Sequence, residues 1–218
     1  MRSNFSVVIA GLTLVFCVPA ARADIGMNPR VGSLGYGIEF SAGVSDRLSL
    51  GVGFNNATRK RQGNTDGVDY EYDLRLRSGE VMANFHPFAG AFRLRAGALL
   101  NRNEFLLTGQ PGGSGTYEFN GVSYPASTVG TLTGKLSFNK SAPYLGLGWG
   151  NRPNGSWGVT FDLGAVYQGK PKLALEATGA AADPALAADL EAERQQAEED
   201  LSSFKWYPVV QLGLYFRF

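Results

Sequence analysis

Long stretches in which apolar and polar residues alternate with a period of two constrain the fold of this chain most. In Leu34–Val44 one face carries Leu, Tyr, Ile, Phe, Ala and Val, while the other is mostly glycine with Glu39 and Ser41. Successive side chains of a β-strand point to opposite sides, so this pattern predicts strands with one apolar and one polar face. The other strands predicted in this way are Leu48–Asn55, Val68–Pro87, Phe92–Thr108, Thr131–Trp149, Trp157–Ala177 and Phe204–Phe218.

The apolar phase slips by one residue inside two of these segments. In Val68–Pro87 it passes from Tyr70 and Tyr72 to Val81 and Phe85. A β-bulge inserts one extra residue into a strand, so we expect a bulge near Ser78-Gly79. A similar slip occurs near Pro143 in Thr131–Trp149.

The connections between the predicted strands alternate between short and long, which is typical of a transmembrane antiparallel β-barrel. Seven strands are clear, and a bacterial barrel has an even number. Ile25–Val31 is the candidate for the eighth, although it contains Pro29. The predicted fold is therefore all-β, an eight-stranded barrel. The short turns are Ser45–Arg47, Phe88–Ala91 and Gly150–Ser156, and the long loops are Asn56–Gly67, Gly109–Gly130 and Thr178–Ser203.

Alternation alone fits a secreted β-sandwich as well, in which the apolar face points inward. Two features favour the inverted arrangement of a membrane barrel, with apolar residues toward lipid. Aromatic residues collect at the strand ends, where interfacial girdles lie, and the polar face is rich in glycine, which weakens a water-facing strand. The predicted partners are thus outer-membrane lipid and lipopolysaccharide. The predicted membrane-interface anchors are Trp149, Trp157, Trp206, Phe216 and Phe218.

Residues 1–23 have the pattern of a secretory signal peptide. Arg2 is followed by an apolar stretch too short for a stable membrane span, and cleavage is expected after Ala23. The domains are therefore a signal peptide, 1–23, and a barrel, 24–218, located in the cell outer membrane. The single cysteine, Cys17, lies in the leader, so the mature chain has no thiol.

The mature chain carries almost no net charge. Arg2 and Arg22 leave with the leader, so 20 − 2 = 18 basic residues face 19 acidic ones, and the net charge is −1. This balance gives no indication of a nucleic-acid partner. The chain finishes on alternating apolar residues with Phe218 last. That ending resembles the signal by which the barrel-assembly machinery recognises outer-membrane proteins.

Many charged side chains lie on the face of their predicted strands that is expected to point into the barrel. Ionised groups cannot face hydrocarbon cheaply, since an arginine or lysine near the midplane costs about 2–4 kcal/mol. Either they form a self-neutralised plug that fills the barrel, or they line a narrow conduit for small zwitterionic or basic solutes. This predicted lumen ladder comprises Glu39, Asp69, Glu71, Asp73, Arg75, Arg77, Arg93, Arg95, Lys135 and Asp162.

The last long loop is acidic and has helical periodicity. Asp183 suits an N-cap and Pro184 the first helical position, so we expect a short helix there. It is either a solvated loop helix or an acidic funnel that concentrates cations. Its acidic residues are Asp183, Asp189, Glu191, Glu193, Glu198, Glu199 and Asp200.

No catalytic or metal-binding constellation stands out. His86 is the only histidine, and it lies beside a short turn without a serine or aspartate constellation at a loop-facing rim. We therefore expect no enzymatic activity, no metal and no cofactor.

Several stretches together resemble the CarO-type outer-membrane proteins and related uncharacterised proteobacterial outer-membrane barrels. They begin with VGSLGYG, 31–37, and continue in the same order along most of the mature chain. The resemblance implies an eight-stranded outer-membrane barrel and, more weakly, solute uptake, since that family is linked to ornithine uptake and carbapenem susceptibility. The other matching stretches are LTGKLSFNK (132–140), APYLGLGW (142–149), WGV (157–159), GKPK (169–172) and KWYPV (205–209).

Two functions are compatible with these observations. One is a narrow porin-like channel for small zwitterionic or basic solutes. The alternative is a plugged structural or interaction barrel that acts through its extracellular loops.

Overall fold

The computed structural model describes residues 25–65, 68–111, 115–150 and 156–218. The predicted signal peptide lies outside these residues. Eight antiparallel strands form a closed ring in the order β1-β2-β3-β4-β5-β10-β11-β13, because β13 pairs with β1 and β4 pairs with β5. The predicted barrel and its weak first strand are confirmed. The strands are β1 Ile25–Gly32, β2 Gly35–Ser45, β3 Leu48–Thr65, β4 Val68–Phe85, β5 Phe92–Asn101, β10 Ser141–Trp149, β11 Trp157–Tyr167 and β13 Trp206–Arg217.

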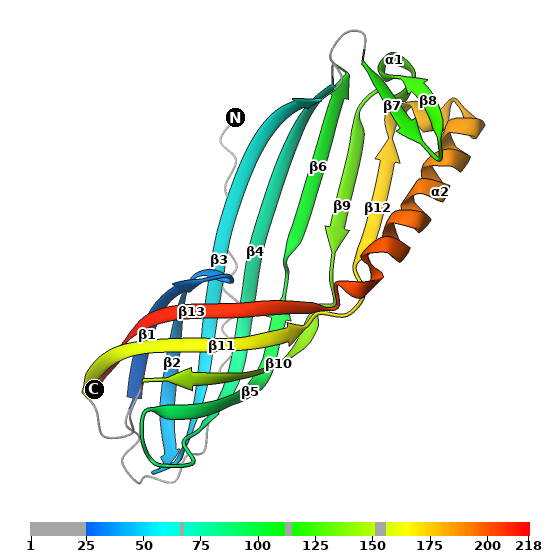
Figure 1. Ribbon diagram of the computed structural model, residues 1–218. Coiled ribbons are helices and arrows are strands. Elements are labelled where there is room, and N and C mark those ends of the chain that lie inside the picture. The colour runs from blue at the N-terminus through cyan, green and yellow to red at the C-terminus, as the bar shows by residue number, and fades with distance from the viewer. Residues whose placement is uncertain (1–24, 66–67, 112–114, 151–155) are drawn as a thin grey trace, which may run out of the picture.

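A sheet extends from one end of the barrel (Figure 1). β3 and β4 are 18 residues each, about twice a membrane span, and stay paired throughout. Beyond the barrel, β4 leaves β5 and pairs with β6, and the order continues to β9 and β12. We call this five-stranded part the extension, and the opposite end of the barrel the turn end. The added strands are β6 Glu104–Pro111, β9 Leu132–Ser137 and β12 Lys172–Ala177.

The structure therefore corrects several predicted boundaries. Residues 56–65 continue β3 instead of forming a loop, and three predicted strands are each broken in two where the chain passes from barrel to extension. The breaks lie between β5 and β6, between β9 and β10, and between β11 and β12.

A cap made of helices and one hairpin packs against the extension (Figure 1). The hairpin turns at Asn120-Gly121, where both residues have positive φ, as a tight two-residue turn requires. The helix predicted after Asp183 is present as α2, which runs beside β12 (Figure 1). No helix among the described residues is long and apolar enough to cross a membrane. The cap consists of β7 Thr116–Phe119, β8 Val122–Pro125, α1 Ala126–Val129, η1 Thr178–Ala181, α2 Pro184–Asp200 and η2 Leu201–Ser203.

The predicted bulge near Ser78-Gly79 is absent from the β3–β4 ladder, which runs without a register shift from Leu48↔Phe85 to Thr65↔Val68. The surroundings of the strand change there instead. After Ser78-Gly79 the odd-numbered side chains of β4, such as Val81, lie on the outer surface of the barrel. Before this point, in the extension, the odd-numbered side chains are charged. The slip in sequence phase thus marks the place where the strand leaves the barrel.

The opposite face of β4 changes in the complementary sense. In the barrel it carries Glu80 and Asn84, which point into the lumen, whereas in the extension it carries Val68 and Tyr70. Val68 belongs to a buried apolar cluster with Leu186 and Leu190 of α2. The single continuous strand β4 therefore has one face that borders a polar lumen in the barrel and an apolar cluster in the extension.

The outer surface of the barrel is apolar, as the inverted arrangement requires. Large apolar side chains of all eight strands are exposed there, for example Leu145 at 68% and Val81 at 55%, while the lumen holds buried arginines and carboxylates. A water-soluble sandwich would show the reverse, so this surface fits hydrocarbon contact.

Replacing Leu163 by arginine is expected to lower the free energy of unfolding in lipid vesicles by about 2–4 kcal/mol. Leu163 is exposed near the middle of β11, so the guanidinium would sit in hydrocarbon. Urea titration in vesicles checks this. The matched control is Ala174→Arg on the exposed side of β12, for which we expect a change within about 0.5 kcal/mol. Equal losses for both variants would contradict the membrane-facing assignment.

Candidate functional site

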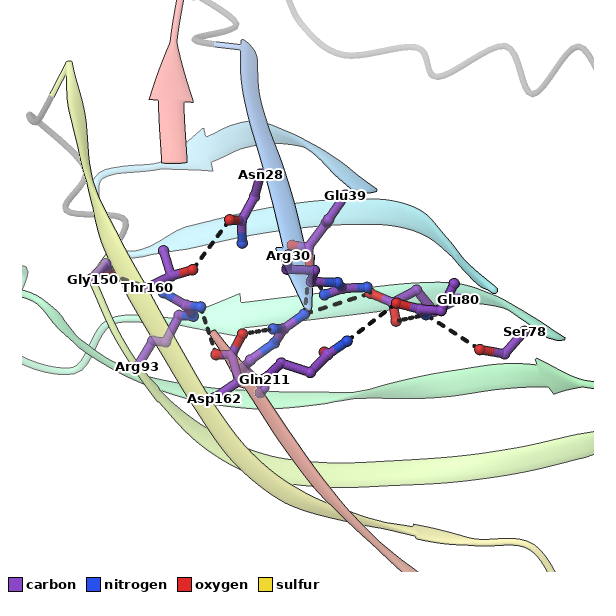
Figure 2. A network of polar contacts seen from close by, with 12 residues as sticks. Asn28, Arg30, Glu39, Ser78, Glu80, Arg93, Gly150, Thr160, Asp162 and Gln211 are labelled. Carbon is purple, nitrogen blue, oxygen red and sulfur yellow. Dashed lines mark hydrogen bonds and ion pairs between the residues drawn. The ribbon is translucent and has the colours of Figure 1, made fainter. Parts of the chain in front are cut away.

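A network of charged side chains crosses the barrel lumen (Figure 2). It contains three arginines and three carboxylates, so it is neutral as a whole. Their side chains are only 1–5% exposed. Isolated buried charges are very costly, which explains why acids and bases occur in equal number. The six residues are Arg30 of β1, Glu39 of β2, Glu80 of β4, Arg93 and Arg95 of β5, and Asp162 of β11.

Two carboxylates tie the arginines together. Asp162 accepts from Arg93 Nη2 at 2.6 Å and also from Arg95 Nη1. Glu39 Oε2 accepts from Arg95 Nη2 at 2.5 Å and from Arg30 Nη1 at 2.7 Å. Arg30 also forms an ion pair with Glu80. The six groups thus form one continuous chain across strands that are distant in the ring.

Uncharged polar groups extend the network around the ring. Gln211 of β13 donates to Asn55 Oδ1 at 3.1 Å, and Asn55 donates to Glu80 Oε2 at 3.1 Å and to Ser78 Oγ at 3.2 Å. The Arg95 guanidinium also lies 5.9 Å from the ring centre of Tyr144 on β10. Every barrel strand therefore contributes to the polar filling.

A second, apolar layer fills the lumen on the extension side of the network. On β5 Leu99 follows Arg95, on β11 Val166 follows Asp162, and Leu34 follows Arg30 just after β1. These residues are buried and belong to one cluster, which Tyr207 also contacts. The other members of the cluster are Met82, Ala142, Tyr144 and Val209.

Together the two layers fill the lumen with buried side chains. A side chain that lines a water-filled pore is reached by solvent, but Arg93 and Arg95 are each 1% exposed, and Leu99 is equally buried. Space remains toward the turn end, since a Cβ added at Gly43 or Gly158 would meet nothing within 4 Å. The lumen is therefore filled at its middle and extension side and roomier at the turn end.

The structure divides the predicted lumen ladder between two places. Glu39, Arg93, Arg95 and Asp162 lie in the lumen network. The other six lie in the extension or at its junction with the barrel, on the surface continuous with the lipid-facing side. Their placement is corrected because the alternation of β4 continues unbroken while its surroundings change. These six are Asp69, Glu71, Asp73, Arg75, Arg77 and Lys135.

Two network members were missed by the sequence prediction. Arg30 lies on the weakest predicted strand, whose inward parity was not assigned. Glu80 shares its parity with Asn84, opposite to the apolar Val81 and Phe85, so the pattern could have identified it.

Four of the displaced charges, Glu71, Asp73, Arg75 and Lys135, form a ladder of ion pairs across the outer face of the extension. Arg75 pairs with Asp73 at 2.7 Å and with Glu104 of β6 at 3.2 Å, and Lys135 of β9 pairs with Glu104 at 2.9 Å. Lys60 of β3 pairs with Glu71 at 3.2 Å. Exposed pairs of this kind contribute little stability each, so the ladder mainly keeps this face soluble and its strands in register.

The acidic residues of α2 mostly dock the helix. Asp189 accepts from the Tyr124 hydroxyl at 2.6 Å and from Asn120 Nδ2 at 3.1 Å, and these hydrogen bonds lower its pKa. Glu198 accepts from the Leu173 backbone N–H at 2.8 Å, which lowers its pKa, as does Arg194. 

The other acidic residues of this segment differ in their partners. Asp183 caps the helix by accepting from the N–H groups of Ala185 and Leu186. Glu193 accepts from the Asn120 N–H at 3.1 Å. Hydrogen bonds from Arg194 and Gln195 lower the pKa of Glu191 to about 2. Glu199 and Asp200 are exposed near the end of α2. Most acidic side chains of this segment therefore accept hydrogen bonds that cap the helix or dock it on the extension.

Acid is expected to loosen α2 while the barrel stays folded. The pKa values of Asp189 and Glu198 are lowered in the folded state, so their contribution is complete above the unfolded value of about 4 and is lost as pH falls through the folded values. A spin label on Ala187→Cys, which is exposed on α2, should gain mobility only below about pH 4. A label at Val52 on the barrel is the control. Mobility that already rises at pH 6, or stays constant to pH 2, would contradict this docking.

The predicted interface anchors lie on the outer surface at the strand ends. At the turn end, Trp157 lies opposite Phe216, and Trp149 contacts Phe92 with ring centres 5.4 Å apart. At the other end, Trp206 contacts Tyr167 at 5.0 Å. Phe218 is 78% exposed. Their action as membrane anchors stays a prediction.

His86 lies at the turn end, where its Nδ1 is 3.0 Å from the Gly90 carbonyl oxygen. Among the described residues no group of three or more histidine, cysteine, aspartate or glutamate side chains is placed to hold a metal ion.

Two solved structures from Acinetobacter baumannii resemble this chain over nearly their whole length. CarO2 has a TM-score of 0.61 and 24% sequence identity, with 90% of this chain and 99% of CarO2 covered. CarO has a TM-score of 0.60 and 26% identity, with 89% of this chain and 98% of CarO covered. No family model matches the chain, and no curated protein matches it. The resemblance to CarO-type proteins is confirmed at the level of the fold, and the chain is an outer-membrane β-barrel protein.

Proposed function

We propose that this protein is a closed outer-membrane barrel that serves as a rigid base for an extracellular recognition surface, the extension. The observation that carries this proposal is the burial of Arg93, Arg95 and Leu99 across the lumen, which leaves no wide path for solute. The extension supports it further, because β3 and β4 pass from barrel to extension without interruption. A surface built on continuous strands is held more firmly than one built on loops.

Uptake into proteoliposomes tests the closed barrel. Vesicles containing the mature protein should take up radiolabelled ornithine or arginine no faster than protein-free vesicles, while vesicles with an open porin should equilibrate. Uptake that saturates with protein content and exceeds the protein-free rate would refute the closed barrel.

Photo-cross-linking in cells tests the recognition surface. A cross-linking amino acid at Gln110 or Thr133, both on the outer face of the extension, should give adducts of defined mass with an envelope or cell-surface component. The matched control is Leu145 on the lipid-facing surface, where adducts to that component should be missing. Identical adduct patterns from all three positions would remove the role proposed for the extension.

A narrow porin-like conduit is the second candidate. The space at Gly43 and Gly158 supports it, because the turn end of the lumen can hold solvent. This function needs both filled layers to rearrange. The predicted acidic funnel has weaker support, since the α2 carboxylates at Asp189 and Glu198 are engaged in docking.

A further inference from the structure

A groove of about 620 Å³ lies on the extension over the ends of β3, β4 and β6 that are farthest from the barrel. We call it the tip groove. Its volume is within the range of about 300–1,000 Å³ typical of small-molecule sites. The polar side chains that line it are Gln62, Asp69, Glu71, Thr108 and Gln110.

These five side chains belong to one face of the sheet. Glu71 lies directly opposite Gln62 on one side and Thr108 on the other, and Asp69 lies opposite Gln110. Residues directly opposite on neighbouring strands point to the same side. The groups therefore form two adjacent rows on a rigid platform.

The polar groups of the tip groove are largely unused by the fold. Closer to the barrel on the same face, the charged side chains of Asp73, Arg75 and Glu104 are paired with one another. By contrast, the described residues provide no side-chain hydrogen bond to Gln62 or Gln110. Amides with free donors and acceptors are available for a ligand.

The two carboxylates are held in place but keep one oxygen free. Asn64 donates to Asp69 Oδ1 at 2.7 Å, and Lys60 donates to Glu71 Oε1 at 3.2 Å. No hydrogen bond from the described residues reaches Asp69 Oδ2 or Glu71 Oε2, so each can accept from a ligand hydroxyl or ammonium.

The composition of the tip groove selects the class of ligand. Amides and carboxylates match ligands that carry many hydroxyl groups, each of which donates and accepts. Among the described residues that line the groove there are two carboxylates and no arginine or lysine, which disfavours anions such as phosphorylated or acidic glycans. We propose that the tip groove binds a hydroxyl-rich saccharide that is neutral or amino-substituted, which rests on the extension being a recognition surface.

Such a saccharide has two sources with the same chemistry. It can belong to the glycan of a neighbouring lipopolysaccharide or to the surface of another cell. The mature protein in nanodiscs free of lipopolysaccharide is applied to an array of neutral, amino-substituted and acidic glycans, including core oligosaccharide of the same strain. Binding to neutral or amino glycans is expected, and the core oligosaccharide distinguishes the two sources.

Variants locate the binding. The double variant Gln62→Ala/Gln110→Ala should weaken binding of the best glycan at least about tenfold, as expected for the loss of two ligand hydrogen bonds. Asp69→Asn should weaken amino glycans more than neutral ones. Lys172→Ala on β12, an exposed residue outside the groove, is the control and should bind as the unchanged protein does.

Binding restricted to acidic glycans, no binding, or binding that the double variant leaves unchanged overturns this inference. If glycan binding is missing while photo-cross-linking from Thr133 still gives a specific adduct, the recognition surface stands and only the ligand class is wrong. Ornithine uptake would instead overturn the closed barrel itself.

Discussion

Replacing Asp162 by alanine is expected to lower the free energy of unfolding in lipid vesicles by about 3–5 kcal/mol. Asp162 accepts from both Arg93 and Arg95, and all three side chains are at most 2% exposed. Without the carboxylate, the hydrogen bonds that the described residues still offer Arg93 are to the backbone carbonyls of Trp149 and Gly150, and a buried charge loses its counter-ion. Urea unfolding followed by tryptophan fluorescence measures the loss.

The matched control for this substitution is Asp46→Ala. Asp46 is exposed in the turn between β2 and β3, so its removal should change stability by no more than about 0.5 kcal/mol. A value for Asp162→Ala that is equal to the control would mean that water already solvates the arginines. The lumen would then be open, contrary to the burial of Arg93 and Arg95.

Replacing Leu186 by aspartate is expected to release α2 from the extension without unfolding the barrel. Leu186 is fully buried in the apolar cluster beneath α2, and deleting a buried leucine side chain costs about 2–5 kcal/mol before the burial of a charge is added. Protease cleavage within residues 179–202 should accelerate at least about 100-fold, because it follows the population of the opened helix.

The exposed neighbour Ala187 provides the control, since Ala187→Asp adds the same charge to the same helix. Its cleavage rate should stay within a few-fold of that of the unchanged protein. The barrel should keep its heat-sensitive migration on gels in both variants. If Leu186→Asp prevents barrel folding, the extension and barrel are one cooperative unit, and the independence of α2 assumed here is wrong.

The barrel could be predicted from the sequence because its alternation is strong and its apolar face is enriched in interfacial aromatics. Parity alone also placed Glu39, Arg93, Arg95 and Asp162 in the lumen, since a strand allows only two faces. The helix at Asp183 was predictable for the same local reason, as an N-cap acts on the residues beside it.

The extension could not be predicted because alternation looks the same inside and outside a membrane. In β4 the polar residues Arg75 and Glu80 have opposite parity, and a bulge is the usual cause of such a change. Here the strand stays regular and its environment changes instead. In the barrel the outer face of β4 meets lipid and the inner face meets the polar lumen. In the extension the outer face meets water and the inner face packs against the apolar cap. Only the pairing of β4 first with β5 and then with β6 reveals this.

The hydrogen bonds by which the acidic residues of α2 dock the helix could not be predicted from the sequence either. Asp189 meets Asn120 and Tyr124 from a hairpin some 65 to 69 positions away, and no local pattern encodes such a contact. The sequence reads as an acidic surface helix in either case, which is why the solvated helix and the funnel could not be separated.

Single-channel recording in planar bilayers tests the closure of the lumen most directly. With Arg93, Arg95 and the apolar layer in place, we predict no current steps above the bilayer baseline in 1 M salt. Asp162→Ala combined with Leu99→Ala thins both filled layers and should produce brief openings. Regular steps from the unchanged mature protein, with a conductance that scales with salt, would contradict the closed barrel.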